Sequence, residues 1–284
     1  MTAQVLSAPR PVAIVSAMAE ELAALLAQAQ AVEVQTHAGR RFHIGTLHGT
    51  PVVLVLCGIG KVAAAMTTTL LAERFAPQCL VFTGVAGGLG DGVRVGDVVV
   101  AESLLQHDMD ASPLFPRFEV PLTGRSRFDA DPALTAALAE AAQALGLGAT
   151  APTLHRGLVI SGDRFVSAAA ECAALRQVLP DALAVEMEGA ALAQVCHDLG
   201  LPFAVLRTIS DRADDSAHVD FTQFIQVAAQ ASAAIVGRWL QSNPSAKEPH
   251  TRCPPASGHR SLQETSVAST AVSTSTKASA AALR

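Results

Sequence analysis

Three carboxylates stand where acid–base or ligand-binding chemistry could be done: Glu21, Glu188 and Asp211. Asp211 ends a very apolar run, beside Arg207 and Ser210. If Asp211 is buried there, it could act as a general acid, because burial raises the pKa of a carboxyl group. The alternative is an aspartate that only caps a helix or makes a turn.

Glu21 lies one helical turn before Leu25 in a predicted helix, Glu20–Gln30, so it borders the apolar face of that helix. A carboxylate at this inner margin is unusual unless a ligand or a reaction uses it. The charge would also be favourable near a helix N-terminus, where the helix dipole attracts anions. The spacing leaves both interpretations open.

Glu188 heads a series of apolar residues at helical spacing, Leu192, Val195 and Leu199, which predicts that its side chain lies on a buried helix face. A buried carboxylate without a partner is costly. A pair of ligand hydroxyls could satisfy it, and so could Arg207 in a structural ion pair. Glu186 falls elsewhere on the helix, and we expect it to be a solvated charge.

The glycine-rich segments do not match phosphate-binding motifs. In residues 83–92, TGVAGGLGDG, Val93 stands where G-x-G-x-x-G needs its last glycine, and residues 55–62 lack two defining positions of a Walker A motif. We interpret residues 84–92 as a loop that lets a flat ligand approach the backbone. The histidines and the five cysteines show no metal-ligand spacing, so we expect no metal site.

Short apolar runs alternate with longer amphipathic ones from residue 11 to residue 242. The predicted strands are Pro11–Ala17, Arg40–Leu47, Thr50–Cys57, Cys79–Thr83, Asp97–Ala101, Leu154–Ser161, Leu183–Val185 and Phe203–Ile209. The predicted helices are Glu20–Gln30, Lys61–Phe75, Pro132–Leu145, Ala168–Val178, Glu188–Leu199 and Val219–Leu240. This alternation predicts one α/β domain whose sheet is covered by helices on both faces.

Polar or flexible residues follow five of these strands. The segments are Met18–Glu21, Gly84–Gly88, Gly162–Phe165, Glu186–Glu188 and Ser210–Arg212. Open α/β sheets bind ligands at the carboxyl ends of their strands. We therefore expect carboxylates, a glycine loop and an aromatic ring to meet at one edge.

Composition limits the class of protein. The 284 residues carry a formal net charge of −5, which argues against nucleic acid as the main partner. No apolar run approaches a membrane span, and residues 1–10 lack a secretory pattern, so we expect a cytoplasmic protein with free thiols. We predict a flexible segment at 1–10, a folded domain at 11–242 and a disordered, low-complexity tail at 243–284.

Several motifs occur in one order along residues 11–242. They are Ala17-Met18-Ala19-Glu20-Glu21, Gly58-Ile59-Gly60-Lys61-Val62, Thr83-Gly84-Val85-Ala86-Gly87-Gly88, Val95-Gly96-Asp97, Ser161-Gly162-Asp163, Val185-Glu186-Met187-Glu188 and Arg207-Thr208-Ile209-Ser210-Asp211. This pattern resembles the 5′-methylthioadenosine/S-adenosylhomocysteine nucleosidases of the nucleoside phosphorylase superfamily. The resemblance implies a three-layer αβα sandwich with a central mixed sheet, no cofactor, and hydrolysis of an N-glycosidic bond to release adenine.

The resemblance also implies roles for individual residues. Glu21 would activate water, and Asp211 would protonate adenine N7 or donate a hydrogen bond to it. Glu188 would hold the ribose hydroxyls, with Met187 against the sugar. The remaining substrate contacts would come from Ile59, Val85, Ala86, Gly87, Phe165 stacked on adenine, Val166 through its backbone, and Arg207 and Ser210, which would orient the carboxylates.

Two segments depart from the better-known members of that family. Val85 stands where many relatives have serine, which removes a hydroxyl contact there. The segment 107–122 also differs; in the family it crosses a homodimer interface to form the pocket for the 5′-substituent. Here that apolar wall would come from Ala111, Leu114, Phe115 and Pro116, unless they pack only on their own domain.

Three other functions stay open at this point. A purine nucleoside phosphorylase would need an arginine-lined phosphate site, and neither the first strand-loop nor residues 83–88 contain an arginine. A nucleosidase for another 6-amino purine nucleoside, such as aminodeoxyfutalosine, would use the same groups. The resemblance leaves 5′-deoxyadenosine open as a further substrate of the implied reaction. A non-catalytic nucleoside-binding protein is disfavoured, because keeping three carboxylates costs stability without a gain in binding.

Overall fold

The computed structural model describes residues 10–147, 152–213 and 217–242. The strands are β1 (Val12–Ser16), β2 (Gln30–His37), β3 (Arg40–Leu47), β4 (Thr50–Leu56), β5 (Cys79–Gly88), β6 (Val98–Gln106), β7 (Arg127–Asp129), β8 (Leu154–Ser161), β9 (Ala182–Glu186) and β10 (Phe203–Asp211). The helices are α1 (Ala19–Leu26), α2 (Lys61–Phe75), α3 (Pro132–Ala144), α4 (Ala169–Val178), α5 (Gly189–Leu199) and α6 (Ala217–Ser242).

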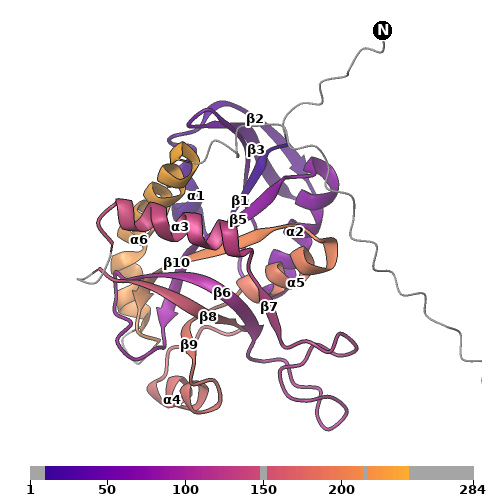
Figure 1. Ribbon diagram of the computed structural model, residues 1–284, viewed down its shortest axis with the longest axis vertical. Coiled ribbons are helices and arrows are strands. Elements are labelled where there is room, and N and C mark those ends of the chain that lie inside the picture. Colours follow the sequence, from indigo (N-terminus) through magenta and orange to yellow (C-terminus); the bar gives the residue numbers. More distant parts are fainter. Residues whose placement is uncertain (1–9, 148–151, 214–216, 243–284) are drawn as a thin grey trace, which may run out of the picture. The chain divides into compact units, whose positions relative to one another are not determined.

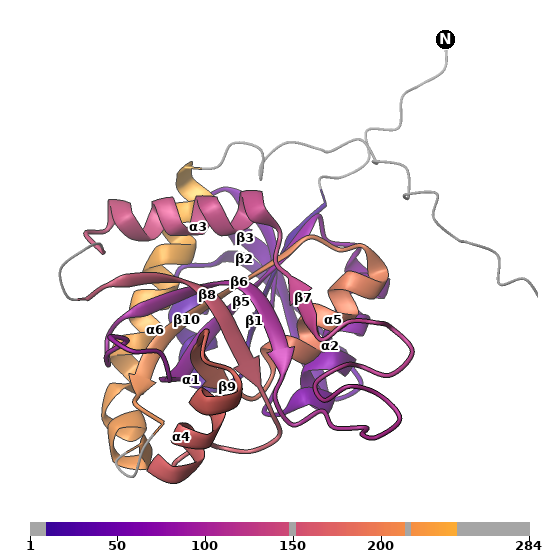
Figure 2. The same ribbon diagram turned by 60° about the horizontal axis from the view of Figure 1, so that its bottom comes forward.

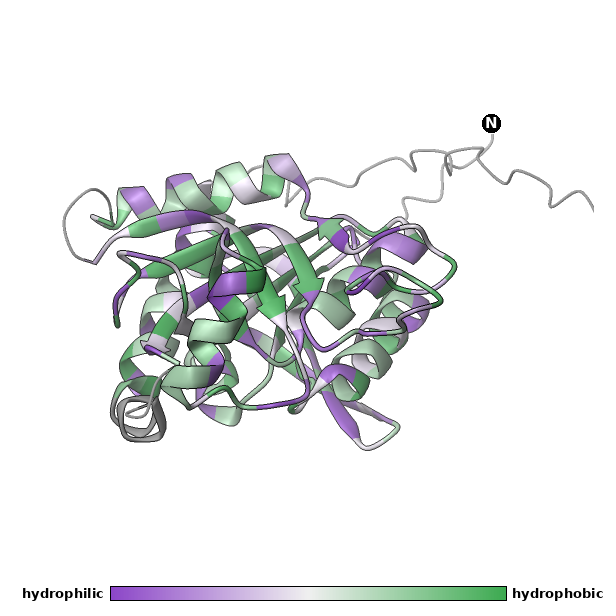
Figure 3. Cartoon of the chain, turned by 90° about the horizontal axis from the view of Figure 1, so that it is seen from below, coloured by the Kyte–Doolittle hydropathy of each residue, from purple (hydrophilic) through white to green (hydrophobic). Residues whose placement is uncertain are grey.

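The central strands bury both of their faces. On β1, Val12 and Ile14 pack in a cluster with α1, α3 and α6, whereas Ala13 and Val15 pack in a cluster with α2 and α5. Successive side chains of a strand point to opposite faces, so an unbroken apolar run serves both layers. Figure 1 shows the two helical layers on either side of the sheet, which confirms the predicted sandwich. In Figure 3 the hydrophobic colour is concentrated on the strands.

The sheet is mixed, and β5 pairs with three other strands. This strand pairs in parallel with β1 and β10 and antiparallel with β9. Strand β6 pairs antiparallel with β10 and parallel with β8, and β8 pairs with β9. Strands β5, β10, β6, β8 and β9 therefore form a closed ring of pairings, which brings the ends of strands far apart in the sequence together.

The predicted elements agree with the structure except at a few places. The first helix ends at Leu26, and residues 30–37 form strand β2, which the sequence analysis did not predict. The short strand β7 was also not predicted, and β6 continues to Gln106, beyond the end of the predicted strand Asp97–Ala101. The predicted glycine loop is wrong at its start, because β5 continues through Gly88.

Several predictions concern properties outside the layered core. The segments 1–9 and 243–284, predicted to be flexible, lie outside the described residues, so that prediction stays open. Cys57, Cys79, Cys172 and Cys196 are buried free thiols, and Cys253 is not described. Across 10–147, 152–213 and 217–242, no helix combines the length and hydropathy that a membrane span requires.

Candidate active site

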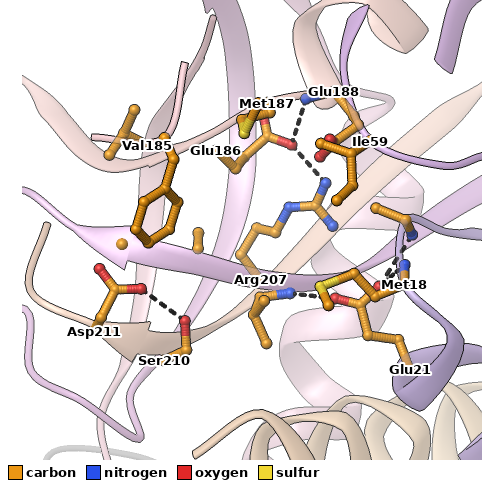
Figure 4. Close-up of a pocket in the computed structure, with 15 residues that line it drawn as sticks. Met18, Glu21, Ile59, Val185, Glu186, Met187, Glu188, Arg207, Ser210 and Asp211 are labelled. Atoms are coloured by element: carbon orange, nitrogen blue, oxygen red, sulfur yellow. Dashed lines mark hydrogen bonds and ion pairs between the residues drawn. The ribbon is translucent and has the colours of Figure 1, made fainter. Parts of the chain in front are cut away.

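A cavity of about 530 Å³ opens where several strands end. Its lining comes from segments that follow β1, β4, β8 and β9 and from residues of β5, β9 and β10: Ala17, Met18, Glu21, Ile59, Val85, Ala86, Gly87, Phe165, Val185, Glu186, Met187, Glu188, Arg207, Ser210 and Asp211. The volume is within the range of small-molecule sites. The predicted convergence at one edge is therefore seen, and Glu21, Glu188 and Asp211 line the same cavity (Figure 4).

Glu21 is held by backbone donors at the start of α1. Its Oε2 accepts hydrogen bonds of 3.0 Å from the N–H groups of Ala17 and Met18, and its Oε1 accepts one of 2.9 Å from Val85. The side chain is almost wholly buried. Burial raises the pKa of Glu21 above its ordinary value, although the charge of Arg207 and the three N–H groups act in the opposite direction. A fixed carboxylate with a raised pKa is suited to take a proton from water.

Asp211 lies at the end of β10, across the cavity from Glu21 (Figure 4). Its Oδ2 accepts a hydrogen bond of 2.9 Å from Ser210 Oγ, and its Oδ1 accepts one of 2.8 Å from the N–H of Ala213. Asp211 therefore closes a local turn and also borders the cavity, so both interpretations of this residue fit its geometry.

Glu186 is buried, and the prediction that it is a solvated charge is wrong. Its Oε2 accepts a hydrogen bond of 2.6 Å from Arg207 Nη2, so the structural partner of Arg207 is Glu186 and not Glu188. Ser161 Oγ and the N–H groups of Glu188 and Gly189 also donate to Glu186. The prediction failed because Glu186 ends β9 before α5 begins, so helical spacing does not apply to it.

The side chain of Arg207 extends from β10 toward Glu186 and Glu21. Its guanidinium lies over the ring of Phe82, 3.8 Å from the centroid, and Figure 4 shows it between Glu186 and Glu21. The Nε and Nη1 atoms are buried and have no hydrogen-bond partner among the described protein groups. Because these two atoms expose almost no surface, they are not open to a ligand in the cavity, and Arg207 acts there through its charge, which lowers the pKa of Glu21.

Glu188 is buried as predicted, although it precedes α5 as its N-cap residue. Its Oε1 accepts a hydrogen bond of 2.8 Å from the N–H of Gly60. Burial raises the pKa of Glu188, and the nearby negative charge of Glu186 raises it further. A carboxyl group held at one oxygen is suited to bind ligand hydroxyls with the other.

Two glycines on β5 make room for the acidic groups. A Cβ atom at Gly84 would lie 2.5 Å from Glu21 Oε1 and 2.9 Å from Arg207 Nη1. A Cβ atom at Gly87 would lie 2.8 Å from Asp211 Oδ1. The sequence predicts that these glycines let a ligand approach the backbone, whereas in the structure they accommodate the side chains of the site.

The remaining predicted contact residues lie in the large cavity or in a smaller one beside it. Ile59, Phe165 and Met187 line the cavity, and Ile59 and Phe165 are 60% and 44% exposed, which leaves their side chains accessible to a ligand. Val166 lines a smaller adjoining cavity that shares Phe165 and Asp211 with the larger one. Ala17, Met18 and Val185 also line the larger cavity but were not singled out from the sequence, because small or apolar residues carry no chemical signal.

Ala111, Leu114, Phe115 and Pro116 do not line the cavity of their own chain. They lie between β6 and β7, and Leu114 is 85% exposed. Their predicted role in a partner's pocket stays a prediction. Among the residues that the structure describes, no group of three or more His, Cys, Asp or Glu side chains is arranged to hold a metal ion.

The family model that matches this chain is that of the phosphorylase superfamily, over residues 11–241. The chain is similar to the 5′-methylthioadenosine/S-adenosylhomocysteine nucleosidase of Neisseria meningitidis in complex with methylthio-immucillin-A, with 37% identity over 82% of this chain and 100% of that chain and a TM-score of 0.78. It is similar to the Streptococcus pneumoniae nucleosidase with a transition-state inhibitor, with 37% identity, 81% and 98% coverage and a TM-score of 0.76. A futalosine hydrolase of Helicobacter pylori is 33% identical, with 82% and 98% coverage and a TM-score of 0.77.

Proposed function

The chain belongs to the phosphorylase superfamily, and within that family we propose that it hydrolyses the N-glycosidic bond of 5′-methylthioadenosine and S-adenosylhomocysteine. The products are adenine and a 5-substituted ribose. The observation that carries this function is the placement of Glu21, Asp211 and Glu188 around one cavity, with Glu21 and Asp211 on opposite sides of it. The enzyme is therefore a hydrolase of nucleosides.

In the proposed mechanism, Asp211 acts on adenine and Glu21 acts on water, from opposite sides of the cavity. Asp211 donates a proton or a hydrogen bond to adenine N7, which makes the base a better leaving group. Departure of adenine leaves a sugar with oxocarbenium character, as in other glycoside cleavages. Glu21 takes a proton from the water that attacks the anomeric carbon. Its three backbone hydrogen bonds hold it in place for that step.

The other lining residues bind the two halves of the nucleoside. Phe165 stacks on adenine, Ala86 and Gly87 line its other side, and Val166 contacts it through its backbone. Glu188 accepts hydrogen bonds from the ribose hydroxyls and stabilises developing positive charge on the sugar. The accessible side chains of Ile59 and Met187 cover the sugar.

A phosphorylase would place phosphate where the proposed mechanism places water. Arg207 is committed to Glu186 at 2.6 Å, and Glu21 stands beside it, so the cavity around them disfavours a phosphate anion. The test is adenine release from methylthioadenosine, adenosylhomocysteine, 5′-deoxyadenosine and adenosine, each with and without phosphate. We expect release without phosphate, and a strict phosphate requirement would reject the nucleosidase.

A nucleosidase that acts on a futalosine-type nucleoside is the second candidate, because a futalosine hydrolase is among the similar structures. The two kinds of substrate differ in their 5′-substituents, so the part of the cavity wall that contacts this group determines which of them is preferred. Adding aminodeoxyfutalosine to the substrate panel tests this alternative, and preferential cleavage of it would reassign the substrate.

We also propose that the enzyme is a cytoplasmic homodimer. Apolar side chains are exposed just before and within the first turns of α2, at Ile59, Val62 and Met66. Leu114 and Leu122 are exposed on the loop between β6 and β7. Lys61 Nζ contacts Asp108 Oδ1 at 2.6 Å, which ties that loop to α2. Ala111, Leu114, Phe115 and Pro116 would then complete the partner's pocket. Light scattering of the wild type and of Leu114→Arg tests this, and a wild-type monomer would contradict it.

A further inference from the structure

Three charged residues beside the cavity have no role in the mechanism above. Lys61 begins α2, Asp108 follows β6 and Asp163 follows β8. Lys61 Nζ lies 2.6 Å from Asp108 Oδ1, and the N–H of Asp163 donates to Asp108 Oδ2 at 2.9 Å. Asp163 Oδ1 in turn accepts a hydrogen bond of 2.7 Å from the N–H of Lys61. The three residues thus form a closed ring of contacts between three segments (Figure 2 shows α2, β6 and β8).

The ring is partly shielded from solvent. The side chains of Lys61 and Asp108 are 16% and 34% exposed. Lys61 Nζ also donates to Gln106 Oε1 at 3.1 Å, and Gln106 donates to Gln194 of α5 at 2.8 Å. Burial opposes ionisation of Asp108, but its contacts with Lys61 and with the N–H of Asp163 hold its pKa below the ordinary value. These groups therefore have fixed partners, unlike mobile surface charges.

The ring contacts the turn that contains Gly60. Gly60 is the N-cap residue of α2, has a φ of 96°, and carries no side chain to cap the helix. Asp163 supplies that cap from another segment through the N–H of Lys61. A Cβ atom at Gly60 would lie only 3.1 Å from Asp163 Oδ1, so the two residues are in close contact.

The same turn holds Glu188. The N–H of Gly60 donates to Glu188 Oε1 at 2.8 Å, and Ile59, the residue before it, lines the cavity. A change in the orientation of the Gly60 peptide would therefore move the donor that fixes the Glu188 carboxyl group.

We propose that Asp163, held by the Lys61–Asp108 pair, is a positioning residue that orients Glu188 toward the ribose hydroxyls through the N–H of Gly60. This inference rests on the proposed function, because that function assigns Glu188 to the sugar. It gives a role in specificity to Lys61 and Asp163, which belong to two of the sequence motifs and to which the mechanism assigns no role.

Comparison of two substrates separates positioning from a merely structural role. We would measure kcat/KM for 5′-methylthioadenosine and for its 2′-deoxy analogue, which lacks one hydroxyl that Glu188 would bind. A structural defect lowers both values equally. A misplaced Glu188 lowers the value for the ribose substrate more, so the preference for the 2′-hydroxyl falls.

The variants are Asp163→Ala, Asp163→Asn and Lys61→Met. We expect the ribose preference to fall about tenfold in Asp163→Ala, which loses the acceptor for the Lys61 N–H, and to fall in the same direction in Lys61→Met. Asp163→Asn keeps an acceptor oxygen and should stay within about twofold of the wild type. The control is Arg127→Met, which removes the 2.7 Å surface pair with Asp181 and should leave the preference unchanged.

An unchanged preference in both Asp163→Ala and Lys61→Met would overturn the inference, even if both variants were slower. If Asp163→Ala does not fold, as judged by circular dichroism, Lys61→Met decides, and an unchanged preference in that variant overturns the inference. A wild-type chain that binds methylthioadenosine without cleaving it would contradict the proposed function alone. The ratio of the two dissociation constants would then test the same network.

Discussion

Arg207 donates a hydrogen bond of 2.6 Å to Glu186, and the two side chains are 1% and 4% exposed. Glu186 is itself fixed by Ser161 Oγ and by the N–H of Gly189. On its other side, Arg207 lowers the pKa of Glu21, whereas burial raises it. The negative charge of Glu186 therefore offsets part of the positive charge that Arg207 exerts on Glu21. As a result, Glu21 stays a stronger base than it would be if Arg207 paired fully with it.

Glu186→Gln should shift the pH dependence of the reaction. The variant leaves Arg207 without a counter-charge, so its attraction for the ionised form of Glu21 increases and the pKa of Glu21 falls. The acidic limb of kcat/KM should then move to lower pH, with a lower plateau because Glu21 is a weaker base. Loss of the Glu186 charge also lowers the pKa of Glu188 and of Cys57, both of which that charge raises, so the Glu188 carboxyl group shifts in the same direction as Glu21. A pH–rate profile measures the shift.

The same variant should be less stable, because removing one partner of a buried ion pair costs about 3–5 kcal/mol. Asp181→Asn is the control. It breaks the exposed Arg127–Asp181 pair, which after solvent screening contributes less than about 1 kcal/mol. Its acidic limb should coincide with that of the wild type. A coincident limb in Glu186→Gln would mean that Glu186 serves stability alone.

Glu21→Gln should abolish most turnover while it leaves binding intact. The amide keeps an oxygen that accepts the N–H of Val85, but it cannot take a proton from water. Loss of a general base lowers kcat by about 10²–10⁴-fold. Adenine release measures turnover, and calorimetry with methylthioadenosine measures binding. Turnover at the wild-type rate would remove Glu21 as the base, and loss of binding with turnover would show that the variant disturbs the cavity itself.

The sequence predicted the layered fold because the central strands are apolar on both faces. Val12–Ser16 and Phe203–Asp211 are buried at every position, so their runs are unmistakable. Strand β2 escaped prediction for the opposite reason. It lies at the end of the sheet order, nearly all of its residues are exposed, and no hydrophobic period marks it. Its residue Gln30 was instead assigned to the preceding helix.

The site was partly predictable because strand ends identify an edge of the sheet, and motif order identifies a family. What could not be predicted was the pairing of charges within the site. The partner of Arg207 depends on where β9 ends and α5 begins, and a difference of a few residues exchanges Glu188 for Glu186. Contacts such as Gly60 with Glu188 join residues far apart in the chain and leave no spacing signal.

Glu188→Gln should be more stable than the wild type, increasingly so as the pH rises. The pKa of Glu188 is raised in the folded protein, so the folded state binds this proton more tightly than the unfolded chain. Stability is therefore lost as the pH rises from the unfolded pKa, near 4.5, through the folded pKa. The amide removes this cost and still accepts the N–H of Gly60. Thermal denaturation between about pH 5 and pH 9 measures the gap in Tm, at roughly 2–4 °C per kcal/mol.

If the difference in Tm between Glu188→Gln and the wild type does not grow with pH, the pKa of Glu188 is not raised in the folded protein. The variant should also lose activity, most strongly at pH values above the raised pKa of Glu188, because there it lacks the carboxylate that stabilises positive charge on the sugar. Stability and turnover therefore move in opposite directions in this variant, which is expected where a buried charge is kept for catalysis.

Gly84→Ala should impair catalysis more than folding. The added methyl group would lie 2.5 Å from Glu21 Oε1 and 2.9 Å from Arg207 Nη1, so one of these groups must move. Displacement of a catalytic group by about 1 Å can cost about 10²-fold in rate. Gly39→Ala is the matched control, because its methyl group meets no atom within 4 Å while its φ of 76° strains the backbone. The control should lose stability and keep kcat, whereas Gly84→Ala should lose kcat. Equal rates in the two variants would show that Gly84 does not set the position of Glu21.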